Sequence, residues 1–395
     1  MNYFKKLFLL IPFVLILICS CEKTEDPTQC STEIFDYTYR VPPNAYDGWT
    51  TASLNDVGLS EYNFYEMMDD IEDFPNHHLN GILIIKDRKL VFEEYFGGTR
   101  FNFDDVYSEG DSILYTLNTE HFLASVSKSV TSLLVGIAVD EGLINGPEDH
   151  ISEYFQSLYP NIFVDGKEDI TLEHLLTMSS GLPWDESSPY NSGQNDVSKL
   201  FNAADPINFV LSRSLEATPG TLFKYNSGGT NVAADMIRLT FGATVRTFAR
   251  IKFFEPLEIN NYHWESISRV YLFASGGLFL KPRDLAKIGQ LTLDKGKWND
   301  KQIVSENWIN NSIQNRINPQ WHGFANGYGY QWWLYDFNVN GKIFNCYFAA
   351  GWGEQMMYIF PSENMIVIFL GQYYSDGPPI PTHQFLYDYI LRSLK

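Results

Sequence analysis

The sequence has few basic residues, few cysteines, and no long apolar segment after its N-terminus. Its 395 residues include 28 Lys and Arg against 48 Asp and Glu, which gives a formal net charge of -20. Binding to a nucleic-acid backbone requires clustered Lys and Arg side chains that replace the phosphate counterions. The sequence contains no such cluster and no stretch that alternates basic and aromatic residues. We therefore expect no nucleic-acid partner and a well-solvated acidic surface.

Several catalytic and metal-binding patterns are also missing from the sequence. It contains no Gly-x-Ser-x-Gly, which argues against the catalytic triad of α/β-hydrolases. It has no Gly-rich loop of the phosphate-binding kind, and its eight His include no His-x-His and no His-Glu-x-x-His. The sequence therefore predicts neither a metal site nor a cofactor.

The N-terminus has the features of an exported protein. Lys5 and Lys6 precede an apolar run over residues 7–18. This run is shorter than the ~20 residues of a transmembrane helix and fits the core of a secretory signal. The sequence Ile18-Cys19-Ser20-Cys21 resembles a bacterial lipobox. We therefore interpret residues 1–20 as a lipoprotein signal peptide, with an ordinary cleaved signal as the alternative.

A lipidated Cys21 would be the only membrane attachment of the chain. The following residues 21–45 are polar and acidic at first and are interpreted as a tether, which places the protein on the bacterial cell envelope. Cys30 and Cys346 would remain as thiols, and an oxidising compartment permits a disulfide between them. Otherwise Cys346 is a small buried residue.

The remaining residues, 46–395, are predicted to form one domain of the α+β class. Strand-like segments occur at both ends of it, and the short connections between them indicate antiparallel pairing. These segments are residues 81–85, 89–95, 342–348, 355–360 and 365–370. A mostly helical insertion over about 145–270 separates the two groups. We expect an antiparallel sheet flanked by helices, an α/β sandwich, with a catalytic cleft beside the insertion.

The main chemical signal is Ser125-Val126-Ser127-Lys128, at the start of a predicted long helix that Gly142 would end. Residues at i and i+3 of a helix share a face, so Ser125 and Lys128 are expected to be neighbours. A Ser hydroxyl becomes a good nucleophile when a base removes its proton, and a Lys with a lowered pKa is such a base. The alternative is a Ser cap followed by a solvated Lys.

Two further segments have compositions that suit a cleft. The loop from Pro219 to Gly229 contains Tyr225 and Ser227 between turn-forming Pro-Gly and Gly-Gly pairs. Tyr225 is a candidate proton shuttle, or else an aromatic lid or core residue. In Ala349-Ala350-Gly351-Trp352-Gly353, small residues would let a substrate approach the strand edge, or else form a bulge or turn.

Taken in order, these three elements resemble the serine β-lactamase and penicillin-binding-protein superfamily. The resemblance is strongest to its class C β-lactamase-like branch of esterases, D-aminopeptidases and 6-aminohexanoate-dimer hydrolases, and it covers about residues 60–395. Three more segments are similar to the branch, namely Asp169–Leu182, Ala274–Ala286 and Gly327–Trp333. His174, in the first of them, is interpreted as a brace rather than a metal ligand.

The resemblance implies a β-lactamase/transpeptidase-like fold and roles for individual residues. Ser125 would be acylated, Lys128 would help to deprotonate it, and Tyr225 would pass a proton to the leaving group. Ser227 stands where many relatives have Asn, as on the nylon-hydrolase and esterase side of the branch. The oxyanion hole would use the backbone N–H of Ser125 and a second donor from the strand at Ala350, Gly351 or Trp352.

The chain departs from the branch in the third motif. β-Lactamases and DD-peptidases usually carry a cation there, where this chain has Ala349-Ala350-Gly351. The sequence therefore predicts a serine hydrolase with a small ester, amide or peptide substrate, and makes efficient β-lactam hydrolysis doubtful. A transacylase on the same site and a noncatalytic binding protein of the envelope are the other hypotheses.

Overall fold

The computed structural model describes residues 37–74, 77–103, 110–320, 323–374 and 381–395. All residues that were predicted to carry the chemistry lie in these ranges. The predicted signal peptide, Cys21 and Cys30 lie outside them. Cys346 is buried in the sheet as a free thiol, and burial raises its pKa.

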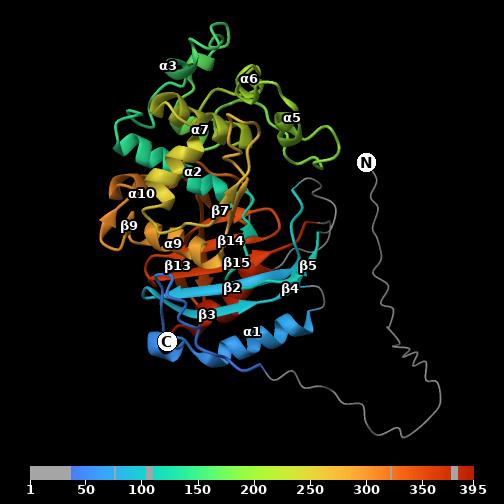
Figure 1. Ribbon diagram of the computed structural model, residues 1–395, viewed down its shortest axis with the longest axis vertical. Coiled ribbons are helices and arrows are strands. Elements are labelled where there is room, and N and C mark those ends of the chain that lie inside the picture. The colour runs from blue at the N-terminus through green and yellow to red at the C-terminus, as the bar shows by residue number, and fades with distance from the viewer. Residues whose placement is uncertain (1–36, 75–76, 104–109, 321–322, 375–380) are drawn as a thin grey trace, which may run out of the picture. The chain divides into compact units, whose positions relative to one another are not determined.

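A central sheet joins strands from both ends of the described chain (Figure 1). Neighbouring strands are antiparallel apart from the short parallel pair β1 and β3. In spatial order the strands are β1 (Thr50–Thr51), β3 (Lys89–Tyr95), β2 (Leu79–Lys86), β15 (Met365–Gly371), β14 (Gln355–Phe360), β13 (Lys342–Gly351), β12 (Trp333–Val339) and β11 (Gly327–Tyr328). The predicted antiparallel sheet is confirmed, with β12 as a strand that the sequence analysis did not predict.

Helices cover both faces of this sheet. Successive side chains of β15 alternate between two apolar clusters, with Ile366 and Ile368 in one and Val367 and Phe369 in the other. The first face packs against α2 (Val126–Asp140) and α9 (Pro282–Leu293), and the second against α1 (Glu61–Asp73) and the C-terminal helical segment. Because both faces are covered, the central strands consist almost entirely of apolar residues.

The C-terminal segment differs from the single helix that its sequence suggests over about 383–394. It consists of α11 (Thr382–Phe385), a π-turn over Leu386–Ile390, and a 3₁₀ turn over Leu391–Ser393. The wider turn lets Leu386, Ile390 and Leu391 all enter the core beside α1.

The predicted helical insertion contains mainly short helices, and α7 is the longest of them. In chain order they are α3 (Ser152–Phe155), a 3₁₀ turn (Lys167–Asp169), α4 (Leu172–Leu176), α5 (Asp196–Asn202), α6 (Pro206–Leu211), α7 (Ser227–Phe241), α8 (Val245–Ala249) and a π-turn (Arg250–Phe254). Figure 1 shows α3, α5 and α6 at the end of the domain away from the sheet. Helices α4, α5, α6 and α8 pack around α7, which in turn contacts α2.

The remaining elements are short. Strands β6 (His121–Phe122), β8 (Leu278–Leu280) and β7 (Tyr262–Trp264) form a small separate sheet, in which β6 precedes α2 in the chain. Two-stranded pairs join β4 (Gly97–Thr99) to β5 (Ser112–Leu114) and β9 (Lys297–Trp298) to β10 (Lys301–Gln302), and α10 (Glu306–Ser312) packs against α2. In the described ranges, no helix combines the length and the hydropathy that a membrane span needs.

The division of the chain at residues 20 and 45 stays a prediction. Residues from the end of the predicted tether already contact the domain. Tyr39 donates its hydroxyl hydrogen to the carbonyl oxygen of Val91 at 2.8 Å, and Arg283 donates to the carbonyl oxygen of Pro43 at 2.9 Å.

Candidate active site

A sharp turn between β6 and α2 presents Ser125. Its predecessor Ala124 has a φ of 45°, in the left-handed region that residues with a side chain rarely adopt. The buried Ser127 fixes this turn, because its hydroxyl donates to the carbonyl oxygen of Ala124 at 2.6 Å and accepts from the amide of Leu278 at 3.1 Å. Ser125 is the N-cap residue of α2 and remains partly exposed. The turn thus places a Ser hydroxyl at the positive end of a long helix.

Lys128 lies against Ser125, as the helical spacing predicted. Its Nζ donates to Ser125 Oγ at 2.8 Å and to the carbonyl oxygen of Ser275 at 2.8 Å, while the residue is only 2% exposed. Burial lowers the pKa of Lys128 to about 8, and the negative charge of Glu186 opposes part of this fall. A lowered pKa increases the fraction of neutral amine at physiological pH, and a neutral amine can accept the proton of Ser125.

Tyr225 completes a group of three side chains. Lys128 Nζ lies 4.8 Å from the centroid of its ring, and Trp333 stacks on the ring at 5.9 Å. Burial raises the pKa of Tyr225 well above 10, the charge of Glu186 adds to the rise, and a hydrogen bond with Ser125 opposes it. Tyr225 is therefore a neutral phenol at physiological pH, and a neutral phenol is a proton donor.

Ser227 is the first residue of α7, and it holds an acidic residue at the site. Its hydroxyl donates to Glu186 Oε1 at 2.6 Å, and its amide donates to Glu186 Oε2 at 3.1 Å. Trp184 Nε1 donates to the same Oε2 at 2.8 Å. The sequence analysis gave Glu186 no role, and no local pattern marks it. The structure brings its carboxylate to the N-terminus of α7 and near Lys128 and Tyr225.

The buried Asn231 connects the loop around Ser275 to α7. Its Nδ2 donates to Ser275 Oγ at 3.0 Å and to the carbonyl oxygen of Ser227 at 2.8 Å, and its Oδ1 accepts from the amide of Ala274 at 2.9 Å. This loop supplies the carbonyl oxygen that Lys128 contacts. Asn231 therefore supports the position of Lys128 from a distance, a role that the sequence analysis missed.

The end of β13 lies beside the turn that carries Ser125. A Cβ on Gly351 would stand 2.4 Å from the carbonyl oxygen of Leu123 and 3.0 Å from the amide nitrogen of Ser125. Glycine is therefore required at this position, because any side chain would collide with the backbone. The strand ends at Gly351, and Trp352 follows it. Ala350 pairs with Met356 and packs in the same apolar cluster as Tyr225, on the other side of β13 from Gly351.

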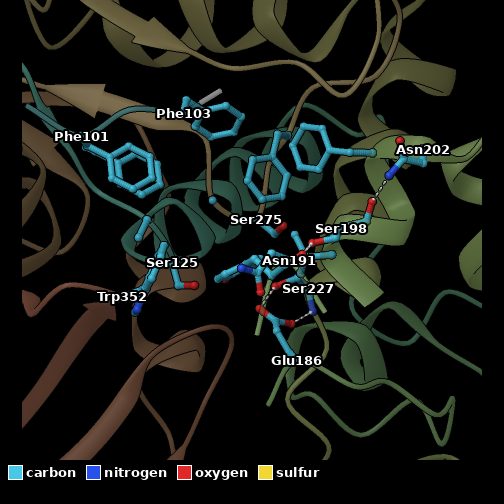
Figure 2. Close-up of a pocket in the computed structure, with 17 residues that line it drawn as sticks. Phe101, Phe103, Ser125, Glu186, Asn191, Ser198, Asn202, Ser227, Ser275 and Trp352 are labelled. Atoms are coloured by element: carbon cyan, nitrogen blue, oxygen red, sulfur yellow. Dashed lines mark hydrogen bonds between the residues drawn. The ribbon is translucent and has the colours of Figure 1, made fainter. Parts of the chain in front are cut away.

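A cavity of about 460 Å³ opens beside Ser125 (Figure 2). Ser125, Ser227 and Trp352 line it together with Glu186 and Ser275. Of the predicted site residues, Lys128, Tyr225, Ala350 and Gly351 are not among the described residues that line it. Seven of the 17 described residues that line it are aromatic and are called the aromatic wall here, namely Phe101, Phe103, Phe122, Tyr190, Phe201, Phe273 and Trp352.

Two of the segments that resemble the β-lactamase-like branch form hydrogen bonds that support the elements around the site. Gln331 donates to the carbonyl oxygens of Leu175 and Leu176, at 3.1 and 2.9 Å, and accepts from Thr230 of α7 at 2.9 Å. His174 forms a capping box with Thr171 at the start of α4. The structure thus gives His174 the bracing position that was predicted for it.

Comparisons with known proteins agree with this geometry. The sequence model of the family described as Beta-lactamase matches residues 69–383, which is most of the chain. The chain belongs to the beta-lactamase family. This family consists mostly of hydrolases that transfer an acyl group to a serine, and it includes esterases, amidases and penicillin-binding-protein homologues. The chain is thus a member of the serine β-lactamase and penicillin-binding-protein superfamily.

Individual relatives are distant. The chain is 24% identical over 271 residues to the 6-aminohexanoate-dimer hydrolase of Paenarthrobacter ureafaciens, an alignment that covers 64% of this chain and 66% of that protein. Beta-lactamase-like protein 4 of Dictyostelium discoideum is 29% identical over 174 residues, which cover 43% of this chain and 28% of that protein. The alignments therefore span less than two thirds of these relatives' own lengths.

Solved structures show the same fold at low identity. A family VIII carboxylesterase has a TM-score of 0.64 at 14% identity, with 84% of this chain and 97% of that chain covered. The class C beta lactamase from Rhodobacter sphaeroides has a TM-score of 0.59 at 14% identity, with 85% and 100% covered. The predicted β-lactamase/transpeptidase-like fold is confirmed.

Proposed function

We propose that this protein cleaves an ester or amide bond through an acyl-enzyme intermediate on Ser125. The distance of 2.8 Å between Lys128 Nζ and Ser125 Oγ, with Lys128 buried, is the observation that carries the proposal. It supplies both parts of an activated nucleophile, a hydroxyl and a base within hydrogen-bond reach. The family of serine hydrolases to which the chain belongs supports the same reaction class.

The proton path follows from the directions of the two pKa shifts. Neutral Lys128 takes the proton of Ser125 as Oγ attacks the substrate carbonyl carbon. Tyr225, whose pKa is raised, gives its proton to the leaving alcohol or amine as the bond to the carbonyl breaks. Lys128 lies over the Tyr225 ring and can return the proton to the phenolate. Water then attacks the acyl carbon, releases the acid product and restores Ser125.

The developing oxyanion is assigned to the backbone at the start of α2. The Ser125 amide would be the first donor, and a backbone amide at Gly351 or Trp352 would be the second. The close approach of Gly351 to the Ser125 amide supports this assignment. The helix dipole of α2 adds to the stabilisation.

Esters and uncharged amides fit the site better than anionic β-lactams do. Glu186 is the charged residue among the described residues that line the cavity, and it is an acid. Because β13 ends in Ala349, Ala350 and Gly351, it offers no side-chain cation to a substrate carboxylate. A charge-assisted hydrogen bond is worth about 1.5–3 kcal/mol, so its absence would weaken the binding of such substrates by about ten- to a hundredfold.

The test is intact-mass spectrometry of the purified protein after brief exposure to a fluorophosphonate, to p-nitrophenyl acetate and to a penicillin. A Ser125→Ala variant is treated in parallel. We expect a fluorophosphonate adduct that the variant lacks, turnover of the acetate, and little turnover of the penicillin. Absence of any adduct in the folded protein would contradict the hydrolase proposal and favour a noncatalytic binding protein.

We also propose that Cys21 carries a lipid that holds the enzyme on the bacterial cell envelope, with no other membrane attachment. The proposal rests on the apolar run over residues 7–18 and on the lipobox-like sequence that follows it. In cells, Cys21→Ala should release the protein from the membrane fraction, and Cys30→Ala, the matched control, should not. Membrane attachment of the Cys21→Ala protein would contradict lipidation at this residue.

A further inference from the structure

The aromatic wall of the cavity is a continuous surface of contacting rings. The centroid of the Trp352 ring lies 5.0 Å from that of Tyr190 and 6.2 Å from that of Phe101. Phe103 lies 6.2 Å from Phe101 and 5.8 Å from Phe201. The rings come from segments that are far apart in the sequence, so the fold has gathered them at this one place.

These rings are only partly covered by the protein. Phe101, Phe103, Tyr190, Phe201 and Trp352 are all half-buried, so part of each side chain stays accessible. Their open faces line a cavity that contains Ser125 (Figure 2). Concave apolar surface of this kind is typical of a ligand site that takes an apolar group.

The charge of the residues that line the cavity limits which ligands can bind there. Among the described residues that line it, none is Lys, Arg or His, and Glu186 is ionisable and acidic. Ser227 and Trp184 fix the Glu186 carboxylate through three hydrogen bonds. An anionic group in this cavity would lie near the Glu186 carboxylate, which repels it, and no cation among the described residues that line the cavity would pair with it.

The position of the cavity relative to Ser125 and Tyr225 indicates which part of the substrate it binds, the acyl group or the leaving group. In the proposed reaction the leaving group must lie within reach of Tyr225, which protonates it. Of the described residues, those that line the cavity include Ser125 but not Tyr225 or Lys128. A cavity that Ser125 lines and Tyr225 does not is suited to the part of the substrate that stays on Ser125, which is the acyl group.

We infer that this cavity is the acyl subsite and that it takes an uncharged acyl group that ends in an aromatic ring. The inference rests on the proposed acyl-Ser125 reaction and adds the substrate class. The substrate would be an arylalkanoyl ester or amide, whose ring packs on the aromatic wall while its carbonyl carbon lies at Ser125. Aromatic rings pair favourably in edge-to-face and offset geometries, which the rings of the wall already adopt with one another.

The experiment compares four p-nitrophenyl esters with the same leaving group and different acyl groups, namely acetate, butanoate, 3-phenylpropanoate and hemisuccinate. In each case Ser125 Oγ displaces p-nitrophenolate, and water later releases the acyl group as the acid. The rates are divided by the rates of alkaline hydrolysis, which removes differences in intrinsic reactivity. We expect kcat/KM to be at least about tenfold higher for 3-phenylpropanoate than for acetate, and about tenfold lower for hemisuccinate than for butanoate.

A pair of variants tests whether the wall causes this preference. Phe201 of α5 belongs to the wall, whereas Phe241 at the end of α7 is also half-buried but is not among the described residues that line the cavity. Phe201→Ala should reduce the ratio of kcat/KM between 3-phenylpropanoate and acetate several-fold, and Phe241→Ala should keep it. Because the readout is a ratio between two substrates, partial loss of folded protein does not affect it.

The outcomes separate this inference from the proposed function. If all four esters acylate Ser125 and their corrected kcat/KM values agree within about threefold, the acyl subsite is refuted and the hydrolase proposal stands. The same holds if hemisuccinate is the best substrate. If no ester reacts and the fluorophosphonate forms no adduct, the proposed function itself has failed. If the wild type shows no preference for 3-phenylpropanoate, the inference is refuted without the variants. If the wild type shows the preference, the Phe201→Ala variant tests whether the aromatic wall causes it.

Discussion

The rate at which Ser125 is acylated should depend on pH through Lys128. Burial lowers the pKa of this side chain from 10.5 to about 8, which corresponds to about 3.4 kcal/mol against its charged form. At pH 7 about a tenth of Lys128 is then neutral, compared with about 0.03% for a lysine of pKa 10.5. The burial of Lys128 thus increases the population of its neutral form, the proposed base, by about 300-fold at this pH.

The assay is the second-order rate constant for labelling by a fluorophosphonate, followed by intact mass from pH 5.5 to 9.5. This reagent needs no proton from Tyr225 for its fluoride leaving group, so the profile reports the nucleophile and its base. The rate should rise about tenfold per pH unit below pH 7, reach half of its maximum near pH 8 and become constant above about pH 9, because the neutral fraction of Lys128 does so. A rate that is flat between pH 6 and 8, or that still rises above pH 9, would refute Lys128 as the base.

Glu186→Gln should move the midpoint of this profile to lower pH. The negative charge of Glu186 raises the pKa of Lys128, and the variant removes that charge and keeps a hydrogen-bond acceptor for Ser227. Glu141→Gln is the control, because Glu141 lies beyond the other end of α2 and pairs with Lys252. Equal midpoints for the wild type and Glu186→Gln, or an equal shift in the control, would refute the electrostatic role of Glu186.

Three further predictions concern the residues around this pair. Gly351→Ala should lower the labelling rate by about a hundredfold, because its Cβ would lie 2.4 Å from the carbonyl oxygen of Leu123 and displace the turn that carries the nucleophile. Ser227→Ala should lower kcat by about tenfold and the melting temperature by about 1–3 °C, because it removes a buried charge-assisted hydrogen bond to Glu186; kinetics and circular dichroism check the two parts. Lys128→Met should abolish labelling and raise the free energy of unfolding in urea by about 1–2 kcal/mol at pH 7. The lowered pKa of Lys128 costs stability below pH 8, and this cost disappears as the pH rises towards 10.5, so the gain from Lys128→Met should disappear there too.

The sequence predicted those features that depend on local spacing. The Ser125 and Lys128 side chains meet because residues three apart share a helix face, and this is true wherever the helix packs. Strands β2, β3, β14 and β15 were predicted from apolar and β-branched residues between turns. Strand β12 was missed because its polar Asp336 and Asn338 face solvent and give the segment a mixed composition.

The features that sequence reasoning missed depend on tertiary structure. Glu186 becomes part of the site only because the N-terminus of α7 and Trp184 meet its carboxylate. The positive φ of Ala124 is imposed by the connection between β6 and α2, and alanine has no sequence preference that indicates it. The aromatic wall combines residues from six separate segments, and each of them alone would be interpreted as core.

The two shifted pKa values also account for the third motif of this chain. A tyrosine that acts as a base needs a nearby cation to stabilise its phenolate, and many relatives supply one at the end of the strand that corresponds to β13. Here that strand ends in Ala350 and Gly351, and the pKa of Tyr225 is raised by burial and by the charge of Glu186. These surroundings favour Tyr225 as an acid and leave the role of base to Lys128. In the proposed mechanism such a site does not need the missing cation for its chemistry, and its absence fits the proposed acyl subsite for uncharged aromatic groups.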